Sequence, residues 1–162
     1  MPAPGGYDNG LRVEGKGVYM LLWMTSGDNQ YHWGILIATS EKGGTLFHQT
    51  YDSQTWQFKP EIKDITQSRS LLCALKLGVV EDNGGTWMNA IETCVRETKV
   101  SGEFTCRTWA LAAIFELADG GFIGLAPSWD TISKIETEAK FQAGDAYSSG
   151  DKTVKASKQS RA

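Results

Sequence analysis

The sequence predicts an α+β fold, because β-type patterns fill its first half and helical patterns fill its second half. Glycine-containing turns separate the early apolar segments, and the apolar spacing changes from two to three or four after residues 83–85. With 162 residues and 41% hydrophobic residues, the chain is long and apolar enough for one packed domain. We expect that domain over residues 17–143, between a flexible arm, 1–16, and a low-complexity tail, 144–162.

Five segments of the first half have the composition and spacing of β-strands. They cover residues 18–23, 31–38, 45–51, 55–59 and 71–80. Glycines at positions 43 and 44 suit a hairpin, so the second and third segments are expected to pair in antiparallel fashion. An antiparallel sheet of about five strands is therefore complete before any long helix begins.

Three helices are expected in the second half, over residues 87–100, over residues 106–118 and from residue 128 onward. The second is apolar on nearly every side from Trp109 to Leu117, so it should be the central helix on which the sheet packs. The third is amphipathic, with Trp129, Ile132 and Ile135 on one side.

Composition excludes several classes of function. The net charge of −3 and the lack of a long basic stripe argue against nucleic acid as a partner. The longest apolar stretch, residues 109–117, is far shorter than the roughly 20 residues that cross a bilayer. The first residues have neither the charged start nor the apolar core of a signal peptide. We therefore expect a cytoplasmic protein without a membrane span.

The three cysteines contain no CxxC pair, so they predict neither a disulfide framework nor a thiol-rich zinc site. Cys73 and Cys94 fall on apolar faces and are interpreted as core thiols. Residues 120–124 are glycine-rich but lack the strand-then-helix context of a phosphate loop, and no dinucleotide fingerprint is present. No cofactor is therefore expected.

Cys106, His32 and His48 are the candidate catalytic residues. Cys106 begins the buried helix, where free backbone N–H groups and the positive helix end favour a thiolate. The two histidines are 16 positions apart about the hairpin turn, so they can pair across the strands on one face. Cys106 would then be the nucleophile, His32 its base and His48 the residue that orients the base. An alternative takes the same three residues as a zinc site with an open position.

Three segments resemble the lecithin:retinol acyltransferase-like group of the circularly permuted papain-like superfamily, which includes the NlpC-type peptidases. The segments are residues 31–37 (YHWGILI), 46–48 (LFH) and 105–109 (TCRTW). The resemblance covers roughly residues 17–120. It implies a circularly permuted papain-like fold, with His32 as base, His48 as polar orienter and Cys106 as nucleophile. Acyltransferase members usually have Asn-Cys-Glu-His-Phe around the nucleophile, so the flanks of Cys106 differ.

The function expected from these residues is a cysteine-dependent hydrolase or acyltransferase that acts on an amide, ester or thioester. Its substrate would be a small molecule, a lipid-like molecule or a peptide. Two alternatives stay open: a cofactor-free isomerase or cyclase that uses His32 and Cys106 as acid and base, and a non-catalytic binding module. The distance between Cys106 and His32 separates catalysis from the binding module.

Overall fold

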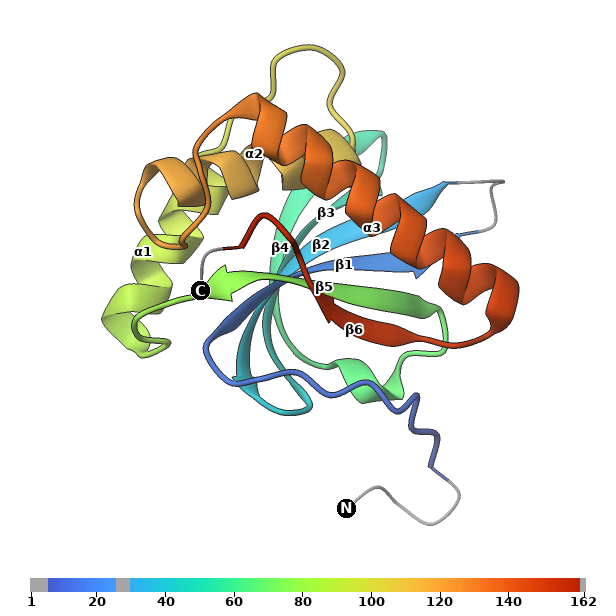
Figure 1. The fold of residues 1–162 in the computed structure, drawn as a ribbon. Helices are drawn as coiled ribbons and strands as arrows, with labels where there is room; N and C mark the ends of the chain where they lie inside the picture. The colour runs from blue at the N-terminus through green and yellow to red at the C-terminus, as the bar shows by residue number, and fades with distance from the viewer. Residues whose placement is uncertain (1–5, 26–29, 161–162) are drawn as a thin grey trace.

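A computed structural model of the chain describes residues 6–25 and 30–160. These residues form a six-stranded sheet and three α-helices, which confirms the predicted α+β class (Figure 1). The strands are β1 (Gly17–Met24), β2 (Tyr31–Ser40), β3 (Gly43–Asp52), β4 (Thr55–Asp64), β5 (Leu71–Val79) and β6 (Thr153–Ala156). The helices are α1 (Gly85–Arg96), α2 (Cys106–Asp119) and α3 (Trp129–Ser149), and a 3-10 turn, η1 (Ile65–Gln67), precedes β5.

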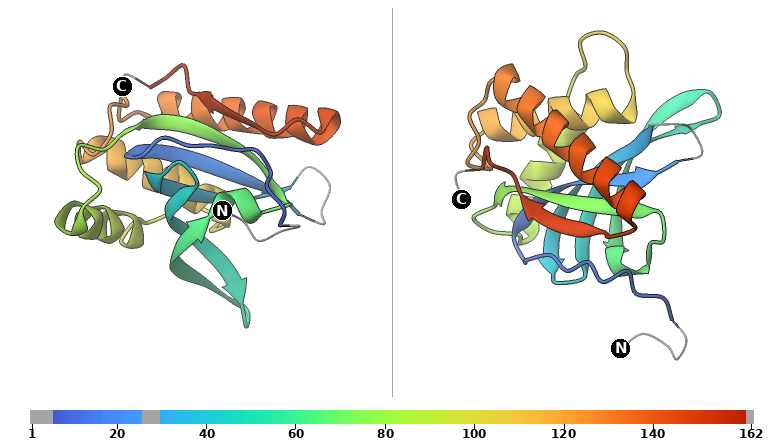
Figure 2. Two further views of the ribbon diagram at one scale, coloured as in Figure 1. Left: turned by 90° about the horizontal axis from the view of Figure 1, so that it is seen from below. Right: turned by 45° about the vertical axis from the view of Figure 1, so that its right-hand side comes forward.

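The strands lie side by side in the order β4-β3-β2-β1-β5-β6. The first five strands pair in antiparallel fashion, as the sequence predicts, whereas β6 pairs with β5 in parallel and makes the sheet mixed. Helices α2 and α3 pack on one face of the sheet, and α1 packs on α2 (Figure 2). The helix that begins at Cys106 is therefore central, as expected.

Residues 144–160 are folded, which differs from the low-complexity tail that the composition predicts over residues 144–162; residues 161 and 162 lie outside the described residues. Helix α3 continues to Ser149 and ends at Gly150, whose φ of 80° lies in the left-handed region that glycine tolerates. The chain then returns as β6, and the buried Gln142 side chain donates hydrogen bonds to the carbonyls of Thr153 and Ala74. Small residues such as Ala146 form the buried side of this part of the helix. Polar residues therefore dominate its composition, although one side of the helix is packed.

Residues 6–16 are also docked, on the face of the sheet that α2 and α3 leave free. Leu11 and Val13 are buried there, and the side chain of Asn9 donates a hydrogen bond of 2.8 Å to the carbonyl of Ile65. The prediction of a flexible arm is therefore wrong for residues 6–16, because the burial of two apolar side chains is enough to hold this segment against the sheet. Residues 1–5 of the expected arm lie outside the described residues.

Side chains of β2 alternate between two apolar clusters on opposite faces of the sheet. Trp33, Ile35 and Ile37 lie in the larger cluster with α2 and α3, which we call the helix-side core. Leu36 and Ala38 lie in the smaller cluster with Leu11 and Val13, which we call the arm-side core. The face on which a residue of β2 lies therefore decides which functional groups it can reach.

Candidate functional site

Cys106 is the first residue of α2, and a capping box fixes its position. Thr105 is the N-cap residue: its hydroxyl accepts a hydrogen bond from the Thr108 amide at 3.1 Å, and its amide donates to the Thr108 hydroxyl at 2.8 Å. The Cys106 thiol contacts the carbonyl of Tyr31 at the start of β2, with an S···O distance of 3.8 Å. The start of α2 is thereby held against the first residues of β2.

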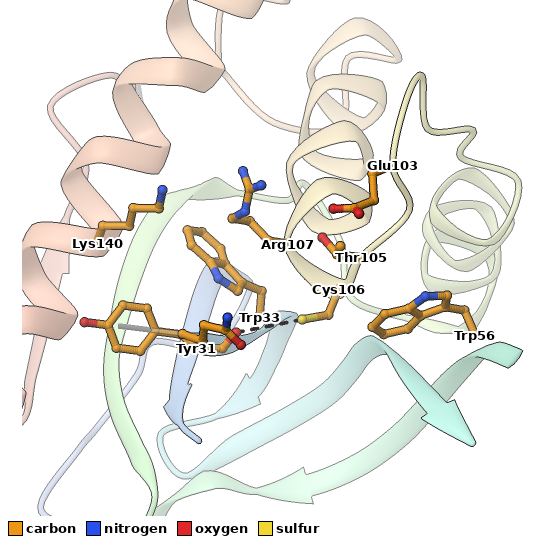
Figure 3. A pocket seen from close by; sticks show the side chains of 9 residues that line it. Tyr31, Trp33, Trp56, Glu103, Thr105, Cys106, Arg107 and Lys140 are labelled. Atoms are coloured by element: carbon orange, nitrogen blue, oxygen red, sulfur yellow. Dashed lines mark hydrogen bonds between the residues drawn. The ribbon is translucent and has the colours of Figure 1, made fainter. Parts of the chain in front are cut away.

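A cavity of about 410 Å³ opens beside Cys106, between the start of α2, the start of β2, β4 and α3 (Figure 3). Its lining residues include aromatic side chains and two cations. The aromatic side chains are Tyr31, Trp33 and Trp56, the cations are Arg107 and Lys140, and Glu103 also lines the cavity. In Figure 3 Trp56 lies on one side of Cys106, and Arg107 and Lys140 lie on the other. We call this the Cys106 cavity.

A shared carboxylate holds the two cations of the Cys106 cavity in place. Oε2 of Glu136 accepts from Arg107 Nη1 at 2.8 Å and from Lys140 Nζ at 2.9 Å. Burial acts to raise the pKa of Glu136, but the hydrogen bonds and charges of Lys140 and Arg107 outweigh it, so the pKa is lowered. Glu136 is thus ionised at neutral pH and restrains two flexible side chains at once.

The surroundings of Cys106 favour the thiol over the thiolate. Burial raises the pKa of Cys106, and the backbone amides of Trp33, Arg107 and Cys106 itself offset this only in part. No histidine lines the Cys106 cavity among the described residues. The helix start therefore does not by itself produce the activated nucleophile that the sequence position suggests.

His32 and His48 lie in contact, although their strands pair in a different register from the predicted one. His48 is opposite Gly34 and not opposite His32, because the turn is formed by Glu41 and Lys42 and one extra residue, Thr39, stands on β2 between Ala38 and Ser40. Together these displace the pairing by two residues from the predicted one. A displacement of two keeps both histidines on one face. The distance between His32 Nε2 and His48 Nδ1 is 2.8 Å, so the predicted contact is present.

The sheet separates these histidines from Cys106. His32 is opposite Trp23 of β1, their ring centroids are 5.2 Å apart, and Trp23 packs against the arm-side core. Trp33, the next residue of β2, belongs to the helix-side core, and Cys106 packs against that core. The structure therefore does not bring His32 or His48 to Cys106. The predicted trio is divided into a thiol on one face and a histidine pair on the other, because adjacent residues of a strand point in opposite directions.

The same separation rules out the zinc site that would use these three residues in this arrangement. Within residues 6–25 and 30–160, no group of three His, Cys, Asp or Glu side chains is placed to hold a metal ion. Cys73 is buried in the helix-side core, where burial raises its pKa to about 12, and Cys94 is half-buried against that core. Both fit the interpretation as core thiols.

Two features of these sites were missed by the sequence reasoning. Glu61 accepts from His48 Nε2 at 2.6 Å, but the fourth strand was predicted to end at residue 59 and in fact continues to Asp64. The alternation of polar and apolar residues across Pro60 was the signal for a longer strand. Lys140 is one turn after Glu136 on α3, a spacing that predicts their ion pair but not its place beside Arg107.

Comparison with protein families, with curated proteins and with solved structures finds no match to this chain. The resemblance to the acyltransferase-like group therefore stays a prediction. No helix in the described part of the chain has the length and apolar character needed to span a membrane.

Proposed function

We propose that the chain is a binding module that takes a small, aromatic, anionic ligand in the Cys106 cavity. The observation that carries this proposal is the convergence of aromatic walls and two restrained cations on one cavity of about 410 Å³. That volume lies in the range of ligand sites, which span roughly 300–1,000 Å³.

The charge of the ligand follows from the groups around the cavity. Arg107 and Lys140 line it with positive charge, and the amino-terminal end of the 14-residue α2 adds its partial positive charge. Glu103 is the opposing carboxylate, but it is exposed at the loop that precedes α2. A guanidinium held by Glu136 loses little side-chain freedom when it binds a carboxylate, sulfonate or phosphate.

The aromatic part of the ligand follows from Trp56 and Tyr31. Trp56 of β4 is half-buried, and its ring lies 5.8 Å from Phe104 and 5.2 Å from Tyr51, centroid to centroid. Trp56 is therefore braced by neighbouring rings and presents a flat apolar surface beside Cys106. Such rigid aromatic surfaces contribute binding energy at a small cost in conformational entropy.

The hydrolase or acyltransferase role, and the isomerase or cyclase role, both need a base that reaches Cys106. In this arrangement the two histidines are on the other face of the sheet, and the thiol has a raised pKa. The geometry thus supports binding better than catalysis. The circularly permuted papain-like fold is likewise a proposal, supported by the order of the two histidine strands and the cysteine helix.

A matched pair of probes tests the proposal. We would titrate the protein with naphthalene-1-acetate and with the neutral naphthalene-1-acetamide, and follow tryptophan fluorescence and the amide NMR signals of residues 103–108. We expect the acid to bind more tightly than the amide. Arg107→Gln should weaken binding of the acid by about 10-fold, or roughly 1.4 kcal/mol, and leave the amide unaffected. Arg96→Gln is the matched control, because Arg96 is an exposed partner of Glu92 away from the cavity.

Equal binding of both probes, or equal binding by the Arg107→Gln and Arg96→Gln proteins, would contradict the proposal. A contrasting outcome is covalent labelling of Cys106 by an electrophilic ester at neutral pH, faster than the labelling of a free thiol. That result would instead support the cysteine hydrolase or acyltransferase.

A further inference from the structure

A chain of hydrogen bonds runs from Glu61 through His48 to His32 on the arm side of the sheet. His48 Nε2 lies 2.6 Å from Glu61 Oε2, and His48 Nδ1 lies 2.8 Å from His32 Nε2. The side chain of His48 is 12% exposed and that of Glu61 is 41% exposed. The chain therefore leads from a largely buried imidazole to a carboxylate in contact with solvent.

The carboxylate fixes the protonation of both rings. An ionised Glu61 can only accept, so His48 Nε2 carries a proton and donates it. The Nδ1 atom of a neutral His48 is then an acceptor, and it must receive its hydrogen bond from a protonated Nε2 of His32. His32 Nδ1 is consequently left without a proton. No hydrogen-bond partner for this atom is found among the described residues.

His32 and its partners line a second cavity, of about 260 Å³, on the face opposite the Cys106 cavity. Its wall includes Trp23, Lys63 and Ser70. The Trp23 ring lies 5.2 Å from the His32 ring and 6.4 Å from the His48 ring, centroid to centroid. Gly34 makes room for it, because a Cβ atom there would lie 3.0 Å from the Trp23 ring. A planar aromatic wall thus lies directly against the two imidazoles.

We propose that Glu61, His48 and His32 form a proton relay, in which His32 Nδ1 is the general base for a small planar ligand bound against Trp23. The ligand would carry an acidic C–H, N–H or O–H bond. The His32 lone pair takes the proton, and the bonding electron pair stays on the ligand. His32 Nε2 passes its proton to His48 Nδ1, and His48 Nε2 passes its proton to the Glu61 carboxylate, which releases it to water. Both rings are then in the opposite tautomer. After the ligand leaves, the reverse transfers from water through Glu61 and His48 return a proton to His32 Nε2, and His32 Nδ1 releases its proton to water in the emptied cavity, so the base is restored.

The electrostatics of the pair agree with a relay in which no charge remains on the rings. Burial and the neighbouring His48 lower the pKa of His32 to about 4, although Glu61 opposes them. Burial also lowers the pKa of His48 against the opposing effect of Glu61, and Lys63 and Lys59 act in the same direction as burial. Both rings are neutral at pH 7, so His32 is available as a base and the proton moves on to the more exposed carboxylate.

This relay does not depend on the function proposed for the Cys106 cavity, since the two cavities lie on opposite faces and share no lining residue. Loss of anion binding by Arg107→Gln would leave the relay unaffected. The two proposals can therefore fail separately.

The first test is the tautomer of each histidine, measured at pH 7 from the long-range ¹H–¹⁵N NMR spectrum of the intact protein. We expect a protonated Nε2 and a bare Nδ1 on both rings. In Glu61→Lys the new ammonium donates to His48 Nε2, so both tautomers should invert and His32 Nδ1 should become protonated. Glu41→Lys, the same change at an exposed glutamate outside the relay, should keep the original tautomers. A protonated Nδ1 on His32 in the unaltered protein would overturn the proposal.

The second test is base catalysis on a nitro-substituted benzisoxazole, a planar probe that needs no co-reactant. Removal of its ring C–H proton forms a nitrile and breaks the N–O bond, which releases a coloured phenolate. We expect His32→Gln to lower the protein-catalysed rate by about 100-fold, Glu61→Lys to do the same by tautomer inversion, and Glu41→Lys to leave it unchanged. We also expect the catalysed rate to rise with pH in the acid range, where His32 loses its proton. A rate that is the same with and without His32 would overturn the proposal.

Discussion

The buried histidine pair should make the protein unstable in mild acid. His32 has a pKa of about 4 in the folded protein and an ordinary value of 6.5 once the chain unfolds. Below pH 6.5 the unfolded chain therefore binds the proton more readily, and stability is lost as the pH falls from 6.5 toward 4. The full contribution of such a shift is on the order of 3 kcal/mol, of which about 2 kcal/mol is lost between pH 7 and pH 5.

The assay is urea unfolding at pH 7 and at pH 5, followed by tryptophan fluorescence. His32→Gln keeps an N–H that can donate to His48 but has no titrating group. It should therefore reduce the loss of unfolding free energy between the two pH values by about 2 kcal/mol. Thr137→Ala, on the exposed side of α3, is the control and should retain the full loss. If the His32→Gln protein shows the same pH dependence as the unaltered protein, His32 is not buried in its neutral form and the reasoning fails.

Three further predictions concern the fold. Leu11→Ala should lower the free energy of unfolding by about 2–5 kcal/mol in urea titrations, because Leu11 is buried; an unchanged midpoint would mean that the arm is not docked. Thr105→Ala should cost about 1 kcal/mol and increase amide exchange at the start of α2, since it removes the N-cap hydroxyl; a cost equal to that of the exposed Thr137→Ala would contradict the capping box. Gln142→Ala should lower the thermal midpoint and increase exchange across β6, because it removes the hydrogen bonds to Thr153 and Ala74; protected β6 amides in this variant would show that β6 docks without Gln142.

Local patterns were enough to predict most elements of the fold. The five strands of the first half, and helices that begin near residues 85, 106 and 129, follow from apolar spacing and glycine turns. Strand β6 could not be predicted in this way, because its four residues pair with β5 from far along the chain and it has no partner nearby in sequence. Such pairing depends on tertiary contacts and not on local propensity.

Local sequence patterns predicted only part of the candidate site. The helix start at Cys106 and the contact between His32 and His48 were predicted, but the face on which each lies was not. A signal for the face was present in β2, because Trp33, Ile35 and Ile37 are together larger and more apolar than the residues that alternate with them. The larger apolar side packs under the helices, which places His32 on the other side.

The most direct test of the separation between Cys106 and the histidines is the rate at which Cys106 is alkylated as a function of pH. Mass spectrometry of the Cys106 peptide distinguishes it from Cys73 and Cys94, and the unaltered protein is compared with His32→Gln. The structure predicts a rate that rises only above neutral pH, as expected for a thiol with a raised pKa, and that is the same in both proteins. A rapid reaction with a second inflection below pH 7, lost in His32→Gln, would show that His32 reaches the thiol and would contradict the account.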